Sequence, residues 1–374
     1  MKISVKVGYQ HHTTVHTNTT QHNNTSPNNH QHRSLINQLI NISIINIIIS
    51  HLTTTDEMAS YTPLQLPYYA PADALPAALP SVEEIEAIAQ ADLDKMITFF
   101  TQQSEEDRRD GDIEEQIETS TDETTIIIGE HFLVRFGKRV HVLEAENMIF
   151  VRENSKIRVP TVYAVFEKGD KTFIIMENVK GRSVHHLDFE LQSGRSSITD
   201  NRTKFRDMFR EVLKAMREMP SLGYYGCLGR RDYDTTCYWE SPEVKAGPFD
   251  TIEEFNAAFR RRWACRHCET GSSGVAGYAD RQARCDELFK ELVAVSSGKD
   301  HSRPVFTHGD LRYFAVYLEE TDELCIVHWD KASFMPEYFE STRRIEEQEG
   351  WLDERFDKEY EIVKKLDASS CVLW

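Results

Sequence analysis

The sequence predicts an α+β protein of two lobes, a small N-terminal sheet lobe and a larger, mainly helical C-terminal lobe. Its 374 residues exceed the roughly 250 to 300 at which a single hydrophobic core stops growing, so two lobes are expected. Residues 124–180 read as strands, a helix and a hairpin, whereas apolar residues in 181–374 mostly follow helical spacing. We therefore place the sheet lobe at 124–180 and the helical lobe at 181–374.

Two segments precede the predicted sheet lobe. Residues 1–57 are rich in Asn, Thr, Ser, His and Gln, and such a polar tract cannot bury enough apolar surface to offset its chain entropy. We expect this segment to be disordered or to come from a wrongly assigned translation start, with Met58 as the natural start. Residues 58–123 combine a Pro-rich stretch, a helix opened by the capping box Ser81 and Glu84, and an acidic linker.

Local patterns define the elements of both lobes. Residues 124–143 have period-two, β-branched character with a turn near Gly129, residues 143–155 have helical spacing, and residues 161–179 form a hairpin turning at Gly169. The helical lobe begins with an amphipathic helix whose apolar stripe is typical of core packing. The helices predicted in this lobe are 203–219, 251–263, 278–295 and a charged terminal helix or helix pair at 344–366.

Charge and cysteine content restrict the partners. A net charge of -18 and a pI near 5.3 disfavour nucleic acid and anionic membranes, while a cationic small molecule remains compatible. Seven cysteines without a secretory signal are typical of free thiols in a reducing compartment, so a cytoplasmic location is expected. The segment CRHC (265–268) lacks the second ligand pair that a zinc site needs, and a plain helix face is favoured there.

The segment FTHGDLRYFAVYLEETDELCIVHWDK (306–331) carries the candidate chemistry. Phosphoryl transfer needs a carboxylate that orients the attacking hydroxyl. His308-Gly309-Asp310 lies between apolar residues and a strand-turn-strand pattern, which is the sequence context expected for this carboxylate. Asp310 is the candidate base or orienting residue, with a retained structural acid as the alternative. His308, in the same motif, is the second candidate residue, either as a proton carrier or as an organiser of the loop.

From Met58 onward the chain resembles the aminoglycoside phosphotransferase family, and within it a fungal branch of mostly uncharacterised members. The resemblance covers roughly 300 residues, the length of one such module. It implies a bilobal, protein-kinase-like fold with a nucleotide cleft between the lobes and ATP as the phosphoryl donor. The matching pieces, in family order, are LPYYAPADALPAALPSVEEI, HFLVRFG, LEAENMIFV, IRVPTVYAVF, FIIMENVKGRSV, GPFDTIEEFN, VFTHGDL and PEYFE.

The resemblance implies residues that contact the nucleotide. Arg135 stands where the family has a lysine and is expected to pair with Glu144, either as a working clamp or as an ion pair that only holds helix to sheet. Met176, Glu177 and Val179 match the hinge that touches adenine through backbone groups. The alternative is that these residues belong to ordinary core packing and do not bind adenine.

The metal positions depart from the family. Ala315 stands where HGDLxxxN has its Asn, and His328 in IVHWD stands where IIDWE has its Asp. Imidazole is a poor ligand for Mg²⁺, which prefers carboxylate and water oxygens. Asp330, which matches the family's following Glu, and His328 are the remaining metal candidates, and firm Mg²⁺ binding is not expected.

Three functional hypotheses follow, and the sequence leaves open whether the protein is an enzyme. The first is ATP-dependent phosphoryl transfer to a small hydroxylated molecule, impaired by the loss of metal ligands. The second is a catalytically silent pseudokinase that binds a nucleotide or a protein partner through the same cleft. The third is a sequence that drifts without a selected function.

Overall fold

The computed structural model describes residues 61–102, 122–184, 199–233, 246–269, 278–311, 315–319, 321, 323–342 and 353–369. All of these belong to the compact unit Met58–Trp374. The predictions for residues 1–57, for nearly all of the acidic linker and for the start of the terminal helical segment lie outside them. None of the helices in the described ranges is long and apolar enough to cross a bilayer.

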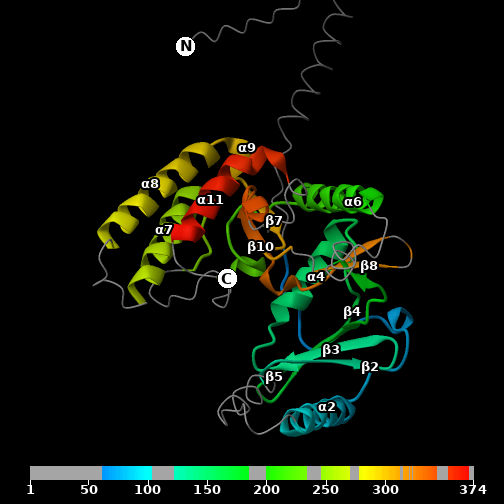
Figure 1. The fold of residues 1–374 in the computed structure, drawn as a ribbon. Coiled ribbons are helices and arrows are strands. Elements are labelled where there is room, and N and C mark those ends of the chain that lie inside the picture. Colours follow the sequence, from blue (N-terminus) through cyan, green and yellow to red (C-terminus); the bar gives the residue numbers. More distant parts are fainter. Residues whose placement is uncertain are drawn as a thin grey trace, which may run out of the picture. The chain divides into compact units, whose positions relative to one another are not determined.

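A five-stranded antiparallel sheet forms the first lobe, in the spatial order β1-β4-β5-β3-β2 (Figure 1). Both predicted turns are confirmed, because Gly129 and Gly169 join paired strands with positive φ angles of 59° and 67°. The strands are β1 (Tyr68–Tyr69), β2 (Thr124–Ile128), β3 (Phe132–Gly137), β4 (Val162–Lys168) and β5 (Lys171–Glu177).

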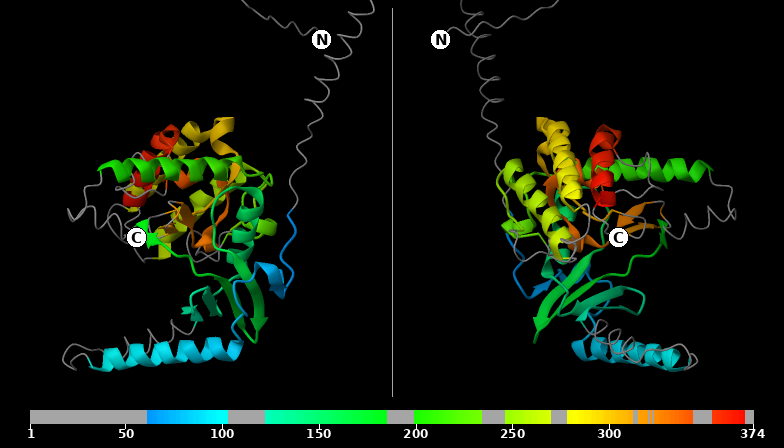
Figure 2. Two further views of the ribbon diagram at one scale, coloured as in Figure 1. Left: turned by 90° about the vertical axis from the view of Figure 1, so that its right-hand side faces the viewer. Right: turned by 60° about the vertical axis from the view of Figure 1, so that its left-hand side comes forward.

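The sheet lobe also takes elements from the segment before residue 124. The short strand β1 pairs with the outer edge of β4, and Leu64 donates its backbone N–H to Glu146 at 2.9 Å. After the 3-10 helix η1 (Ala72–Ala74), the helix α2 (Val82–Gln102) packs on the sheet. Both views of Figure 2 show α2 on the side of the sheet away from the helical lobe.

The alternation of side chains along β5 divides them between two cores. Phe173 and Ile175 join the cluster that contains Ile85 of α2, whereas Ile174 and Met176 join the cluster that contains the helix α4 (Val142–Asn154). Successive strand residues point to opposite faces, so one strand is buried on both sides. The sheet is therefore sandwiched between α2 and α4.

The Ser81 half of the capping box predicted for α2 is confirmed. Ser81 Oγ accepts the backbone N–H of Glu84 at 3.1 Å, which satisfies one of the donors that a helix start leaves without an intrahelical partner. A second cap occurs in the other lobe, where Thr251 Oγ1 accepts the N–H of Glu254 at 3.2 Å. Both helices therefore begin where the sequence predicts.

The second lobe is mainly helical. The stripe predicted on α6 buries Phe205, Phe209, Leu213 and Met216, as a core-facing surface should. The backbone of CRHC is helical, within α7. The longer helices are α6 (Thr199–Glu218), α7 (Ile252–Glu269), α8 (Tyr278–Ser296) and α11 (Asp357–Ser369). The short helices are η3 (Leu228–Arg230), α9 (Lys299–Ser302), η6 (Trp329–Lys331), α10 (Phe339–Thr342) and η8 (Glu354–Phe356).

Two small antiparallel sheets position the loops of the second lobe. One joins β6 (Arg182–Ser183), β8 (Val316–Leu318) and β9 (Leu324–Ile326), and the other joins β7 (Pro304–Thr307) to β10 (Ser333–Pro336). The predicted α+β class is confirmed, with a small antiparallel sheet followed by a larger, mainly helical part.

Candidate functional site

The pairing of β7 with β10 brings two loops together. Thr307 lies opposite Ser333 in this ladder, so the loop that follows β7 meets the turn that precedes β10. We call residues 308–311 the HGD loop and residues 328–331 the HWDK turn. Asp310 in the loop accepts a hydrogen bond from Lys331 Nζ in the turn at 2.8 Å. Two segments about 20 residues apart thus form one site.

His308 connects the HGD loop to the chain that enters the HWDK turn. Its side chain is fully buried, Nε2–H donates to the carbonyl of Val327 at 2.9 Å, and Nδ1 accepts the N–H of Asp310 at 3.3 Å. The ring lies edge-on to Trp329, with centroids 4.6 Å apart. Both nitrogens are engaged with the backbone in the neutral tautomer, an arrangement suited to bracing the turn.

Glu340 binds the backbone of the HGD loop. The sequence analysis assigned it no role, although it ends the matched piece PEYFE. Its buried carboxylate accepts the backbone N–H of Gly309 at 3.0 Å and of Leu311 at 3.3 Å. Gly309 has φ of +81°, and a Cβ at this position would lie 2.8 Å from the carbonyl oxygen of Lys331. The acid and the glycine together fix the loop that carries Asp310.

Asn147 of α4 holds the HWDK turn and was also missed by sequence reasoning. Its fully buried side chain donates from Nδ2 to the carbonyls of Trp329 at 2.7 Å and Ala332 at 3.2 Å. Its Oδ1 has no hydrogen-bond partner among the described residues. The signal that could have found Asn147 is a polar side chain on the face that this helix buries.

A cavity of about 350 Å³ lies between the sheet lobe and the turn. Much of its wall is apolar, as in most small-molecule sites. It contains every residue that the resemblance assigns to the nucleotide, together with one metal candidate: Arg135, Glu144, Met176, Glu177, Val179 and His328. His308, Asp310 and Asp330 are not part of its wall.

Arg135 and Glu144 form the expected strand-to-helix contact. Arg135 donates from Nη1 to Glu144 Oε2 at 2.7 Å and also bonds Glu123. Glu144 is almost fully buried, and this burial raises its pKa to about 7, opposed by the charge of Arg135 and assisted by that of Asp330. The carboxyl group therefore titrates near neutral pH.

This pKa predicts that Glu144 makes the protein less stable as the pH rises from about 4.5 to about 7. In this range the folded state keeps a proton that the unfolded state has lost, so the stabilisation is fully present below the unfolded pKa and disappears through the folded one. We expect a change of roughly 1–3 kcal/mol. Urea unfolding at about pH 5 and about pH 8 measures it. Glu144→Gln should change less between the two pH values, and an equal change would contradict the assignment.

In the hinge segment, one carboxylate and two backbone N–H groups are already bound within the protein. The carboxylate of Glu177 is held by Arg158 Nη1 and by the N–H of Thr161, each at 3.0 Å. The N–H groups of Glu177 and Asn178 donate to backbone carbonyls at 2.8 and 2.9 Å. The N–H of Val179 has no acceptor among the described residues. It is the hinge donor that a bound base could use.

The donor set at the metal positions does not fit Mg²⁺. Ala315 is buried and offers only a methyl group, while its carbonyl accepts the N–H of Val327 at 2.9 Å. Desolvation lowers the pKa of His328, which leaves a neutral imidazole where the ion requires oxygen. Asp330 remains as an acid, but within the described ranges no group of three or more acidic, His or Cys side chains could hold a metal ion.

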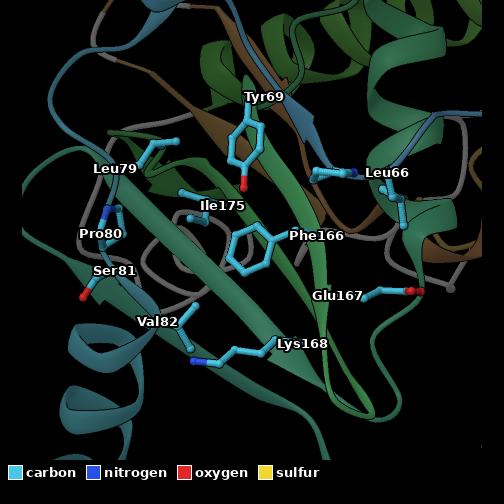
Figure 3. A pocket seen from close by; sticks show the side chains of 11 residues that line it. Leu66, Tyr69, Leu79, Pro80, Ser81, Val82, Phe166, Glu167, Lys168 and Ile175 are labelled. Carbon is cyan, nitrogen blue, oxygen red and sulfur yellow. The ribbon is translucent and has the colours of Figure 1, made fainter.

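A second cavity, of about 580 Å³, lies on the α2 face of the sheet (Figure 3). In Figure 3 the hydroxyl group of Tyr69 points toward Ile175 and Phe166, with Leu79 beside them. Lys168 at its rim pairs with Glu83 at 3.3 Å. None of the candidate site residues lines this cavity, whose charged lining residues are Glu167 and Lys168. The cavity beside the HWDK turn is therefore the candidate site.

Comparison with known proteins finds solved structures that are similar to the chain at low sequence identity. No protein-family model matches the chain, and no curated protein matches it. A thermostable mutant of the aminoglycoside phosphotransferase APH(4)-Ia, in a ternary complex with ADP and hygromycin B, is 14% identical with a TM-score of 0.40, covering 68% of this chain and 81% of that chain.

Two further solved structures are similar to the chain at comparably low identity. The gentamicin complex of APH(2″)-IIa is 14% identical with a TM-score of 0.38, covering 70% of this chain and 85% of that chain. Spectinomycin phosphotransferase APH(9)-Ia, with ADP and spectinomycin, is 10% identical with a TM-score of 0.36, covering 69% and 86%.

Proposed function

We propose that the protein is a kinase-like phosphotransferase that binds ATP in the 350 Å³ cavity and phosphorylates a small hydroxylated molecule. The observation that carries the proposal is the convergence of Arg135, Glu144, the hinge at 176–179 and His328 on one cavity next to the HGD loop. The base stacks between apolar side chains such as Leu133 and Met176 and bonds the hinge backbone. Arg135 supplies positive charge for the phosphates.

In this proposal Asp310 orients the acceptor hydroxyl and takes its proton. The hydroxyl oxygen bonds to the terminal phosphorus, the bond from that phosphorus to the bridging oxygen breaks, and ADP leaves with the electron pair. No step is assigned to Mg²⁺, because the donor set does not fit it. Losing one preorganised electrostatic contact typically lowers the rate by about 10²- to 10³-fold, so turnover should be slow. The net charge of -18 favours a cationic acceptor.

A second candidate function is a catalytically silent nucleotide-binding module. Lys331 on the carboxylate of Asp310 favours it, together with Ala315 and His328 at the metal positions. A carboxylate paired with an ammonium group is a weaker proton acceptor than an unpaired one. In this case the cavity binds its ligand for recognition of a protein partner rather than for chemistry.

Thermal-shift titration with ATP, followed by an ATP turnover assay, tests the proposal. ATP should raise the Tm of the wild type, and Asp310→Asn should lose turnover by about 10²-fold or more while keeping the Tm shift. Leu133→Trp should abolish the shift by filling the candidate cavity, whereas Leu79→Trp in the second cavity should keep it. A wild-type Tm that ATP does not move contradicts both candidate functions, and binding without turnover selects the silent one.

A further inference from the structure

The ammonium group of Lys331 is bound to the carboxylate of Asp310, the candidate base. Its Nζ is 2.8 Å from Asp310 Oδ2, and the two side chains are only 24% and 20% exposed. Lys331 closes the HWDK turn three residues after His328, which lines the candidate cavity. The pair is therefore a partly buried contact on a turn that contributes His328 to the cavity wall, rather than a contact on an open surface.

Both halves of this pair are held by buried side chains. Glu340 binds the backbone on either side of Asp310, and Asn147 binds the carbonyls on either side of Asp330 and Lys331. The two segments also approach closely where Gly309 meets the carbonyl of Lys331. Because the backbone on both sides is already held, pairing of Lys331 with Asp310 costs only the side-chain rotamer entropy.

This arrangement opposes a divalent ion at the same carboxylate. A metal bound by Asp310 would have to displace the ammonium group or lie next to it, and like charges at such distances repel strongly. The two positions that would compensate are Ala315, with no side-chain oxygen, and His328, whose imidazole is a poor ligand for Mg²⁺. The site thus disfavours Mg²⁺ for two reasons: it lacks the oxygen ligands, and the ammonium group of Lys331 already occupies the carboxylate of Asp310.

We propose that Lys331 is the resident cation of the site and that the protein binds the phosphate groups of a nucleotide without a divalent metal ion. This inference rests on the proposed function. An ammonium group carries three N–H donors, so it can contact a carboxylate and a phosphate oxygen at once. Arg135 in the cavity wall and Lys331 beside Asp310 are the two cations that meet the phosphates.

Dissociation constants for ATP and for adenosine, measured in EDTA and in Mg²⁺, test this inference. The wild type should bind ATP equally well in both, within about twofold, and more tightly than adenosine. Lys331→Met should weaken ATP binding by about tenfold or more and leave adenosine binding unchanged, because adenosine lacks the phosphates that the cation contacts. The matched control is Lys290→Met on the exposed face of α8, which should bind both ligands like the wild type.

The outcomes separate this inference from the proposed function. ATP binding that strengthens tenfold or more in Mg²⁺, or a Lys331→Met variant that keeps wild-type ATP affinity in EDTA, overturns the inference and leaves the nucleotide site standing. Failure of both adenosine and ATP to bind overturns the two together. If Lys331→Met does not fold, Lys331→Arg decides: it keeps a cation and should keep metal-independent binding, and loss of that binding in a folded Lys331→Arg protein counts against the inference.

Discussion

Glu340→Ala is expected to lower the free energy of unfolding by about 2–5 kcal/mol, since it removes a buried carboxylate that accepts hydrogen bonds from two backbone N–H groups. Those groups belong to Gly309 and Leu311, which flank Asp310. The loop should therefore lose its defined position, and ATP turnover should fall together with stability. Urea unfolding and the turnover assay measure the two effects.

Two variants control for the removal of an acid in general. Glu340→Gln keeps one oxygen acceptor but turns an NH₂ group toward the other N–H, so its destabilisation should be intermediate. Glu354→Ala removes a carboxylate that is 70% exposed and should change stability by only about 0.5 kcal/mol. A Glu340→Ala protein as stable as Glu354→Ala would show that the loop does not depend on this acid.

Gly309→Ala is expected to destabilise the protein by about 3 kcal/mol or more, because two penalties combine. A φ of +81° is unfavourable for any residue with a Cβ, at a cost of about 1–2 kcal/mol. The added Cβ would also lie 2.8 Å from the carbonyl oxygen of Lys331, so the loop and the turn must separate. The second penalty acts directly on the contact between Asp310 and Lys331.

Gly169→Ala is the matched control for this substitution. Gly169 has φ of +67°, but a Cβ there would meet nothing within 4 Å. Its alanine variant should show the backbone penalty alone, and the difference between the two variants reports the close approach at the site. Equal loss of stability in both would mean that the loop and the turn can move apart at little cost. Unfolding curves with unchanged slope make the comparison valid.

The elements predicted from local patterns agree closely with the structure. The hairpin at Gly169 and the helix Val142–Asn154 were predictable because turn residues and apolar spacing act over a few neighbouring residues. The contact between Arg135 and Glu144, whose partners lie nine residues apart on adjacent elements, was expected from the family resemblance. The sequence thus contains these features within short windows.

The contacts that assemble the site were less accessible. Lys331 meets Asp310 across 21 residues, Gly309 meets Glu340 across 31, and Asn147 meets Trp329 across 182. Each depends on how strands and helices pack, which no local pattern specifies. The two-residue strand β1 could not be found from periodicity, because it is defined only by its pairing with β4.

The short strand formed by Tyr68 and Tyr69 also has a consequence for how this protein tolerates trimming. It occupies the outer edge of β4, where uncovered N–H and C=O groups would otherwise attract a strand from another molecule. A shortened version of the chain that starts after residue 70 would open this edge and invite self-association. These two tyrosines therefore protect the sheet edge against aggregation, at a position outside the candidate site.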